Sequence, residues 1–250
     1  SGSNSYIGPD PVFVIPDKNS GTCEPALSFD ADNTLLDFDK TEKEALRKTF
    51  TMQKIPFTPA MKNRYLQINT ALWNAYEEGR MTREEVIFTR FCKLFDEFHI
   101  AEDGVQFEHI YQKELGKGHA LMPHALELVK HLKKDYELYI VTNGVSATQH
   151  SRLHDSGLDQ HIRKAFISEE IGYRKPMKEY FDYCFAHIPS FEKGQTLIIG
   201  DSLSSDMQGG IHAGIATCWM NPKQKPNVQD LPITYEITHL KELYSILEED

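Results

Sequence analysis

From about residue 121 to the end of the chain, short apolar segments alternate with segments of helical periodicity, and this alternation constrains the fold more than any other feature. The apolar run at 196–199, for example, is followed by a helical pattern over 206–213 and then by a second apolar run at 216–219. Strands that alternate with helices pair in parallel and form a doubly wound sheet. We therefore predict an α/β fold with a Rossmann-like, doubly wound parallel sheet, which binds ligands at the carboxyl ends of its strands.

The same patterns predict where the other strands and helices lie. The first strand is expected at 26–29, ahead of the alternating region, and it ends at Asp30. Further strands are expected at 138–141, 165–167 and 234–237. The remaining helices are expected to begin near Pro123, to run from Ser146 to a closing glycine at Gly157, and to span 178–187 and 240–247.

Residues 40–118 show helical periodicity throughout and no strand alternation. A capping box, Thr82-Arg83-Glu84-Glu85, marks the start of one of these helices. Because the stretch is too long for a simple connection between two strands, we predict a helical domain over 39–118. It is inserted into a sheet domain that comprises 25–38 and 119–250.

Residues 1–24 are rich in proline and glycine, so we predict an irregular arm with a short extended piece at 12–15. The first five residues of the chain, Ser-Gly-Ser-Asn-Ser, are typical of an expression scar.

Charge and cysteine content argue against several classes of protein. The formal net charge is −10 and the densest basic run is only 131–134, so a nucleic acid polymer is not expected as a partner, whereas a small phosphorylated substrate is compatible. The four cysteines are far apart and form no C-x-x-C pair, which disfavours a structural zinc site and fits a cytoplasmic protein. No apolar run approaches the roughly 20 residues that span a bilayer, so we expect no membrane partner.

Two carboxylates, Asp30 and Asp32, follow the first predicted strand. Like charges this close raise each other's pKa unless a cation separates them, and Mg²⁺ prefers such oxygen ligands. Asp30 could then attack phosphorus as a nucleophile, and Asp32 could act as a general acid and later as a base. Taken alone, the segment also fits a turn followed by a helix cap.

Polar groups also follow the next two apolar segments. Thr142 and Asn143 come directly after the strand at 138–141, where a hydroxyl and backbone amides can hold phosphate oxygens. Lys175 precedes a proline and a predicted helix, and it could neutralise both a phosphate and the nucleophile. Taken alone, these segments are better explained by an Asn-Gly turn and by a solvated lysine at a helix start.

Asp201 directly follows the strand at 196–199, and Asp206 comes five residues later. Asp201 could complete a magnesium site, with Asp206 binding through water or orienting the ligands. A serine helix cap would account for Asp206 but leaves Asp201 unexplained. Because all four groups are expected at one edge of one sheet, a single site explains them together.

These four motifs resemble those of the haloacid dehalogenase superfamily. They are Asp30-Ala31-Asp32-Asn33-Thr34, then Thr142, then Lys175-Pro176, and finally Gly200-Asp201-Ser202 with Asp206. The resemblance implies a Rossmann-like core with an inserted cap, and the stretch at 39–118 is similar to the helical cap of the first subclass. It also implies that Mg²⁺ is held by Asp30, the backbone carbonyl of Asp32, and Asp201.

Several segments of the core resemble the pyrimidine 5′-nucleotidase branch of that superfamily. They are Phe29-Asp30-Ala31-Asp32, Thr142-Asn143-Gly144, and the segments 167–172, 181–183 and 209–219. The resemblance implies a substrate among the nucleoside monophosphates, such as dUMP and dTMP. Trp73, Tyr76 and Tyr65 of the helical region are candidates for stacking on a base, although most of these aromatic side chains are expected to form its core.

In the mechanism that the resemblance implies, Asp30 forms an aspartyl-phosphate while Asp32 protonates the leaving oxygen and then activates water. Thr142, Asn143 and Lys175 bind the other phosphate oxygens. Two alternatives remain open. One is a phosphatase or phosphomutase that acts on sugar phosphates or other small metabolites, and the other is a non-catalytic phospholigand-binding protein. The sequence makes no prediction about oligomeric state.

Overall fold

The computed structural model describes residues 16–19, 21 and 24–248. The extended piece expected at 12–15 and the expected expression scar lie outside the described residues. In the described part, one sheet runs in the order β3-β2-β1-β4-β5-β6 with every pair parallel, which confirms the predicted doubly wound fold. Its strands are β1 (Ala26–Asp30), β2 (Glu137–Thr142), β3 (Lys164–Ile167), β4 (Thr196–Gly200), β5 (Ala216–Met220) and β6 (Tyr235–Ile237).

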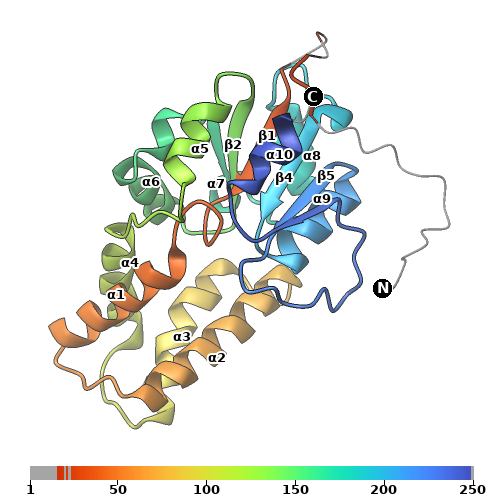
Figure 1. The fold of residues 1–250 in the computed structure, drawn as a ribbon. Helices are drawn as coiled ribbons and strands as arrows, with labels where there is room; N and C mark the ends of the chain where they lie inside the picture. Colours follow the sequence, from red (N-terminus) through yellow and green to blue (C-terminus); the bar gives the residue numbers. More distant parts are fainter. Residues whose placement is uncertain (1–15, 20, 22–23, 249–250) are drawn as a thin grey trace.

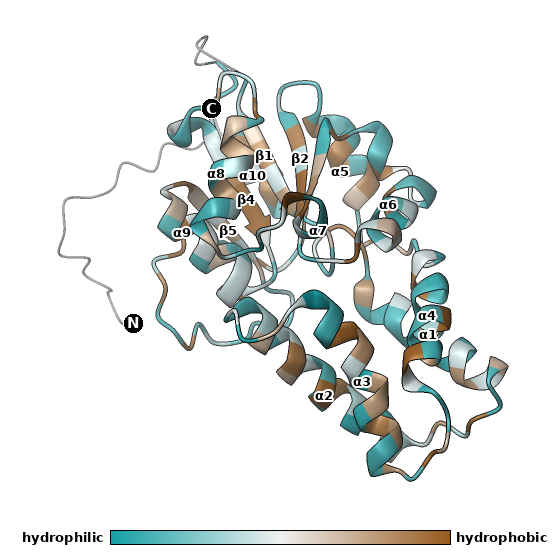
Figure 2. Ribbon diagram, turned by 180° about the vertical axis from the view of Figure 1, so that it is seen from behind, coloured by the Kyte–Doolittle hydropathy of each residue, from teal (hydrophilic) through white to brown (hydrophobic). Residues whose placement is uncertain are grey.

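Helices cover both faces of this sheet (Figure 1). They are α5 (Ala125–Leu132), α6 (Ser146–Asp155), α7 (Ser168–Ile171), α8 (Lys178–Ala186), α9 (Gln208–Ala213) and α10 (Glu242–Glu248), with short 3₁₀ turns at Leu158–Gln160 and Lys193–Gln195. Helices α5, α6 and α10 pack on one face, against side chains such as Phe29 and Ile140. Helices α8 and α9 pack on the other, against Tyr139 and Ile198. The central strands β2 and β4 are accordingly mostly apolar (Figure 2), because both of their faces are buried.

Four further helices lie beyond the carboxyl edge of the sheet (Figure 1). They are α1 (Phe38–Met52), α2 (Pro59–Glu77), α3 (Arg83–Glu97) and α4 (Gly104–Gly116). Their apolar side chains, among them Phe50, Phe91 and Phe107, form a core separate from the two cores of the sheet. We therefore propose 39–118 as a cap domain and 25–38 with 119–250 as the core domain.

Local sequence signals explain several helix ends. The capping box before α3 is formed in both directions: Thr82 Oγ1 accepts from the Glu85 N–H at 3.1 Å, and the Glu85 carboxylate accepts from the Thr82 N–H at 3.3 Å. Gly157 follows α6 with φ +81°, a conformation that favours glycine. Both features were predicted from the sequence.

Two local features differ from the prediction. The helix expected over 206–213 begins earlier, with a π-helical turn at Leu203–Met207 that leads into α9. Ser202 caps this turn, because its hydroxyl accepts from the Ser205 N–H at 3.1 Å. The short helix α7 was not predicted, since four residues are too few to show a period.

Among the described residues, no helix combines the length and the apolar character that crossing a membrane requires.

Candidate active site

The predicted site residues gather at the carboxyl edge of the sheet, where the strand order reverses. The chain runs outward from β1 to β3 on one side and then returns to β4 on the other. Such a reversal opens a crevice in which doubly wound sheets bind ligands. A cavity lies there between the sheet and the helices of the proposed cap. Its walls include Asp30, Asp32, Thr142, Asn143, Lys175 and Asp201 from the sheet domain, and Phe38, Asn69, Trp73, Glu77, Arg90, Gln112 and Leu115 from α1 to α4.

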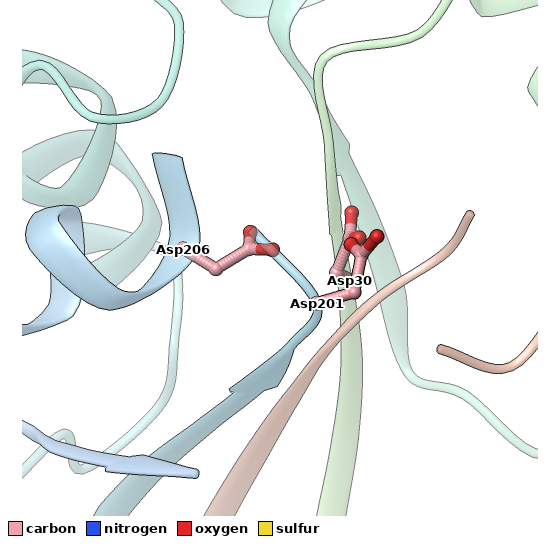
Figure 3. A group of neighbouring side chains, drawn as sticks. All are labelled: Asp30, Asp201 and Asp206. Atoms are coloured by element: carbon pink, nitrogen blue, oxygen red, sulfur yellow. The ribbon is translucent and has the colours of Figure 1, made fainter. Parts of the chain in front are cut away.

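Three carboxylates converge at this edge. One oxygen each from Asp30, Asp201 and Asp206 lies within 4.8 Å of the others. Figure 3 shows the Asp206 carboxylate pointing from the π-helical turn toward those of Asp30 and Asp201 at the strand ends. The structure therefore brings together three acidic residues from distant segments of the chain.

Lys175 joins two of these carboxylates. Its Nζ donates to Asp30 Oδ1 at 2.9 Å, to Asp206 Oδ1 at 2.6 Å, and to the Val141 carbonyl at 3.0 Å. The side chain is almost completely buried. Burial alone would lower the pKa of Lys175, but the carboxylates of Asp206 and Asp30 outweigh it and raise that pKa, so the ammonium form persists.

The acidic group carries more charge than Lys175 neutralises. Three carboxylates against one ammonium leave two negative charges in a buried place. Burial raises the pKa of Asp201 to about 6 and that of Asp206 to about 7, and it raises the pKa of Asp30 well above its usual range, with Asp201 adding to the effect. A divalent cation with a preference for oxygen would balance this charge, so the donor set fits Mg²⁺.

Asp206 was predicted as an indirect metal ligand, and the structure places it as the partner of Lys175. Its second oxygen accepts from the Ser202 N–H at 3.2 Å, and its side chain is fully buried. A Cβ at Gly200 would lie 2.2 Å from this oxygen. Only glycine at the end of β4 therefore lets Asp206 approach so closely.

Thr142 and Asn143 occupy the positions expected of phosphate-binding groups, and their side chains already have partners. Thr142 Oγ1 accepts from the Gly144 N–H at 3.1 Å and from Gln149 Nε2 at 2.9 Å, which leaves its own proton free to donate. The Asn143 amide accepts from the Lys175 N–H at 2.9 Å and donates to the Lys175 carbonyl at 3.0 Å. The Asn143 side chain thus aligns Lys175, and a phosphate contact would fall to its backbone N–H.

Asp32 is held by two side chains that the sequence analysis did not identify. Arg152 Nη1 donates to Asp32 Oδ1, and Gln149 Nε2 donates to Asp32 Oδ2 at 3.2 Å. Both residues come from α6, the helix predicted to start at Ser146. Positions three apart share a helix face, so their spacing was a usable signal.

Of the three aromatic residues considered for base stacking, one lies at the cavity. Trp73 is half-buried and forms part of its wall. Tyr65 is fully buried and stacks on Phe91, with ring centroids 4.9 Å apart. Tyr76 is buried, and its hydroxyl forms a hydrogen bond with Ser168 Oγ at 3.2 Å. Tyr65 and Tyr76 are therefore structural residues of the helical region.

The parallel, doubly wound sheet and the acidic cluster at its switch point define a Rossmann-like protein with inserted helices and a candidate metal site. Comparison with known families makes the assignment specific. The sequence profile described as haloacid dehalogenase-like hydrolase matches residues 27–220. The chain belongs to this family.

Three bacterial proteins are similar to nearly the whole chain. YfnB of Bacillus subtilis, named only as a haloacid dehalogenase-like (HAD) hydrolase, is 52% identical over 88% of this chain and 94% of its own length. Its crystal structure, described as bound to magnesium, superposes with a TM-score of 0.86 and covers 90% of this chain and 99% of that one. The pyrimidine 5′-nucleotidases PynA of Streptococcus pneumoniae and YjjG of Escherichia coli are 37% and 31% identical, over 90% and 88% of this chain and 95% and 96% of their own lengths.

Proposed function

We propose that this protein is a Mg²⁺-dependent phosphatase that hydrolyses pyrimidine nucleoside 5′-monophosphates through an aspartyl-phosphate at Asp30. The observation that carries the proposal is the position of Lys175 Nζ, within hydrogen-bond distance of both Asp30 and Asp206, whose carboxylates converge with that of Asp201. A buried lysine next to a buried carboxylate nucleophile can stabilise the charge of a phosphoryl group during transfer.

Magnesium would be held by the carboxylates of Asp30 and Asp201 and by the backbone carbonyl of Asp32. When bound, it would supply positive charge that neutralises both the carboxylates and the transferred phosphoryl group. The relative YfnB, described as magnesium-bound, supports this choice of metal.

The residues of the chain would carry out two steps. Asp30 attacks phosphorus, and the bond to the leaving oxygen breaks as Asp32 donates a proton to that oxygen. Asp32 then takes a proton from water, the water oxygen attacks phosphorus, and Asp30 leaves as a carboxylate. Thr142 and Lys175 donate to the phosphate oxygens throughout. General acid–base catalysis accelerates a reaction by about 10²–10⁴-fold. Stabilisation of the phosphoryl group by fixed positive charge must therefore supply most of the remaining acceleration.

The nucleotide substrate rests on PynA and YjjG and on the position of Trp73. We expect Trp73→Ala to raise KM for dUMP and dTMP roughly tenfold or more, because stacking on a base contributes about 1–3 kcal/mol. The KM for glycerol phosphate, which has no ring, should change little. Steady-state kinetics on both substrates check this, and an equal rise in KM on both would contradict a base contact.

A phosphate-release assay over a panel of nucleoside, sugar and small-acid monophosphates, with and without Mg²⁺, tests the proposal and its alternatives. The proposal predicts Mg²⁺-dependent release, fastest from pyrimidine nucleotides. Preference for a sugar phosphate would instead indicate a different metabolite phosphatase. Turnover only after addition of a sugar bisphosphate would indicate a phosphomutase. Binding of phosphate esters without any release would indicate a phospholigand-binding protein.

The acidic cluster also predicts how stability depends on pH. Since the pKa of Asp201 is about 6 and that of Asp206 about 7, the folded protein holds more protons than the unfolded chain between the usual carboxyl pKa and these values. Their contribution to stability is therefore lost as pH rises through this window. In EDTA we expect the unfolding temperature to fall between pH ~5 and ~8.

Addition of Mg²⁺ should reverse this loss. At a hundredfold excess over its Kd and pH ~8, we expect a rise in unfolding temperature of roughly 5–10 °C, with a smaller rise at pH ~5, where protons compete. Asp201→Asn should flatten the pH dependence and weaken the response to Mg²⁺. An equal response at both pH values, or an unchanged one in Asp201→Asn, would argue against this metal site.

A further inference from the structure

We propose that Arg152 and Gln149 are positioning residues that fix the carboxylate of Asp32 for proton transfer to the leaving group. This inference rests on the proposed function, since it assigns the residues that act through its general acid. Both Asp32 oxygens accept a hydrogen bond from α6, one from Arg152 Nη1 and one from Gln149 Nε2. The Asp32 side chain remains partly exposed at the cavity, where a substrate can reach it.

Arg152 is itself rigidly placed. It is completely buried, its Nε donates to the Gly118 carbonyl at 2.9 Å, and its Nη1 also donates to Gln149 Oε1 at 3.0 Å. The Phe38 ring lies under the guanidinium, with its centroid 5.5 Å from Cζ. These contacts fix the guanidinium through Nε and Nη1, while the buried Nη2 has no hydrogen-bond partner among the described residues. The bond from Nη1 therefore holds the Asp32 carboxylate in one orientation.

Two of these contacts come from the segments that connect the helices of the proposed cap to the sheet. Phe38 starts α1, and Gly118 lies just after α4. Gly118 also packs closely against the first turn of α1, because a Cβ at Gly118 would clash with the Thr41 side chain. Arg152 therefore ties the orientation of Asp32 to both connections.

Gln149 extends the same arrangement to the phosphate-binding side. Its Nε2 donates to Thr142 Oγ1 at 2.9 Å as well as to Asp32. Gln149 thus contacts Oδ2 of Asp32, while Arg152 contacts Oδ1. Because the Gln149 amide donates to Thr142 Oγ1, the proton of the Thr142 hydroxyl points away from Gln149 and can be donated to another group.

Misplacing a general acid has a characteristic kinetic effect, because esters with poor leaving groups need protonation and those with good ones do not. We expect Arg152→Gln to lower the rate of the first step, measured as phenol or nitrophenol released in a single turnover, roughly 10²-fold for phenyl phosphate and less than about tenfold for p-nitrophenyl phosphate, within the range that a general acid contributes. The later hydrolysis of the aspartyl-phosphate, in which Asp32 acts as the base, is common to both esters and does not enter this measurement. The ester concentration that half-saturates the first step should change little. Arg152→Lys, which keeps the charge, should recover part of the loss, and Gln149→Met should show a smaller effect in the same direction.

A double-mutant cycle tests whether Arg152 acts through Asp32. Adding Arg152→Gln to Asp32→Asn should cost no further activity, because both changes remove one function. His150→Gln, an exposed change on the same helix, is the matched control and should leave kcat for both esters unchanged. Thermal unfolding establishes that each variant is folded, and Gln149→Met carries the same test if Arg152→Gln does not fold.

Three results would overturn the inference. Equal losses of the first-step rate on both esters would mean that Arg152 has only a structural role. A large rise in KM for every ester would mean that it binds phosphate directly, and additive losses in the cycle would mean that it acts apart from Asp32. If the wild-type protein released no phosphate from any ester, the proposed function would fail and this inference with it. If the wild type is active but the variants lose the same factor on phenyl phosphate and on p-nitrophenyl phosphate, this inference is wrong while the proposed function stands.

Discussion

Replacing Asp30 by Asn is expected to lower turnover roughly 10⁴-fold or more while the protein stays folded, because the substitution removes the proposed nucleophile. The amide has almost the same shape as the carboxylate. It also removes one of three converging negative charges, while Lys175 keeps its bond to Asp206. The unfolding temperature should therefore stay the same or rise slightly. Phosphate release and thermal unfolding, measured on the same preparation, check both parts.

Asp182→Asn is the matched control for this variant. Asp182 is exposed on α8 and forms a surface ion pair with Lys178, at 2.7 Å, so its loss should leave turnover and stability nearly unchanged. Full activity of Asp30→Asn would refute the role of Asp30. Loss of activity together with loss of the fold would show that Asp30 is needed structurally instead.

Replacing Lys175 by Met should reduce both activity and stability. Three buried acceptors lose their donor, two of them carboxylates left without a cation, at a cost of about 3–5 kcal/mol. For a chain of this size this corresponds to a fall in unfolding temperature of roughly 6–20 °C. Turnover should fall about 10²–10³-fold or more, since a charge that stabilises the transferred phosphoryl group is lost. Addition of Mg²⁺ should recover part of the stability but not the activity.

Lys178→Met, three residues along the chain, provides the comparison. Lys178 is largely exposed and forms a surface ion pair, so the same change there should alter the free energy of unfolding by less than about 0.5 kcal/mol. Equal effects of the two substitutions would mean that the contacts of Lys175 with Asp30 and Asp206 contribute nothing special.

The fold could be predicted from the sequence because the strands are buried on both faces. All five residues of β1 and of β4 are buried, and continuous apolar runs of this length between helical patterns leave few topologies. The start of the helix after β4 could not be predicted, because it depends on a cap by the Ser202 hydroxyl and on the contact between Asp206 and Lys175. Such contacts exist only once distant segments have come together.

The acidic part of the site could be predicted for a similar reason. Asp30 ends the buried strand β1 and Asp201 directly follows the buried strand β4, so the topology alone brings them together. Arg152 and Gln149 were missed because a helix interior normally gives such residues to solvent or to neighbouring turns. Both are buried here, in contact with Asp32, which is more than 100 residues away in the sequence. The sequence predicts that Asn143 binds phosphate, whereas its side chain binds the backbone of Lys175. This contact could not be predicted because it joins residues that are 32 positions apart.

The most direct measurement of the central claim is chemical trapping of the phosphorylated enzyme. Asp32→Asn should still accept the phosphoryl group from p-nitrophenyl phosphate, whose leaving group needs no acid, but it should hydrolyse the intermediate slowly. After acid quenching, mass spectrometry should find one phosphoryl group on Asp30, and hydroxylamine should remove it. Steady turnover with no phosphorylated aspartate, or with the phosphoryl group on a different residue, would contradict the account.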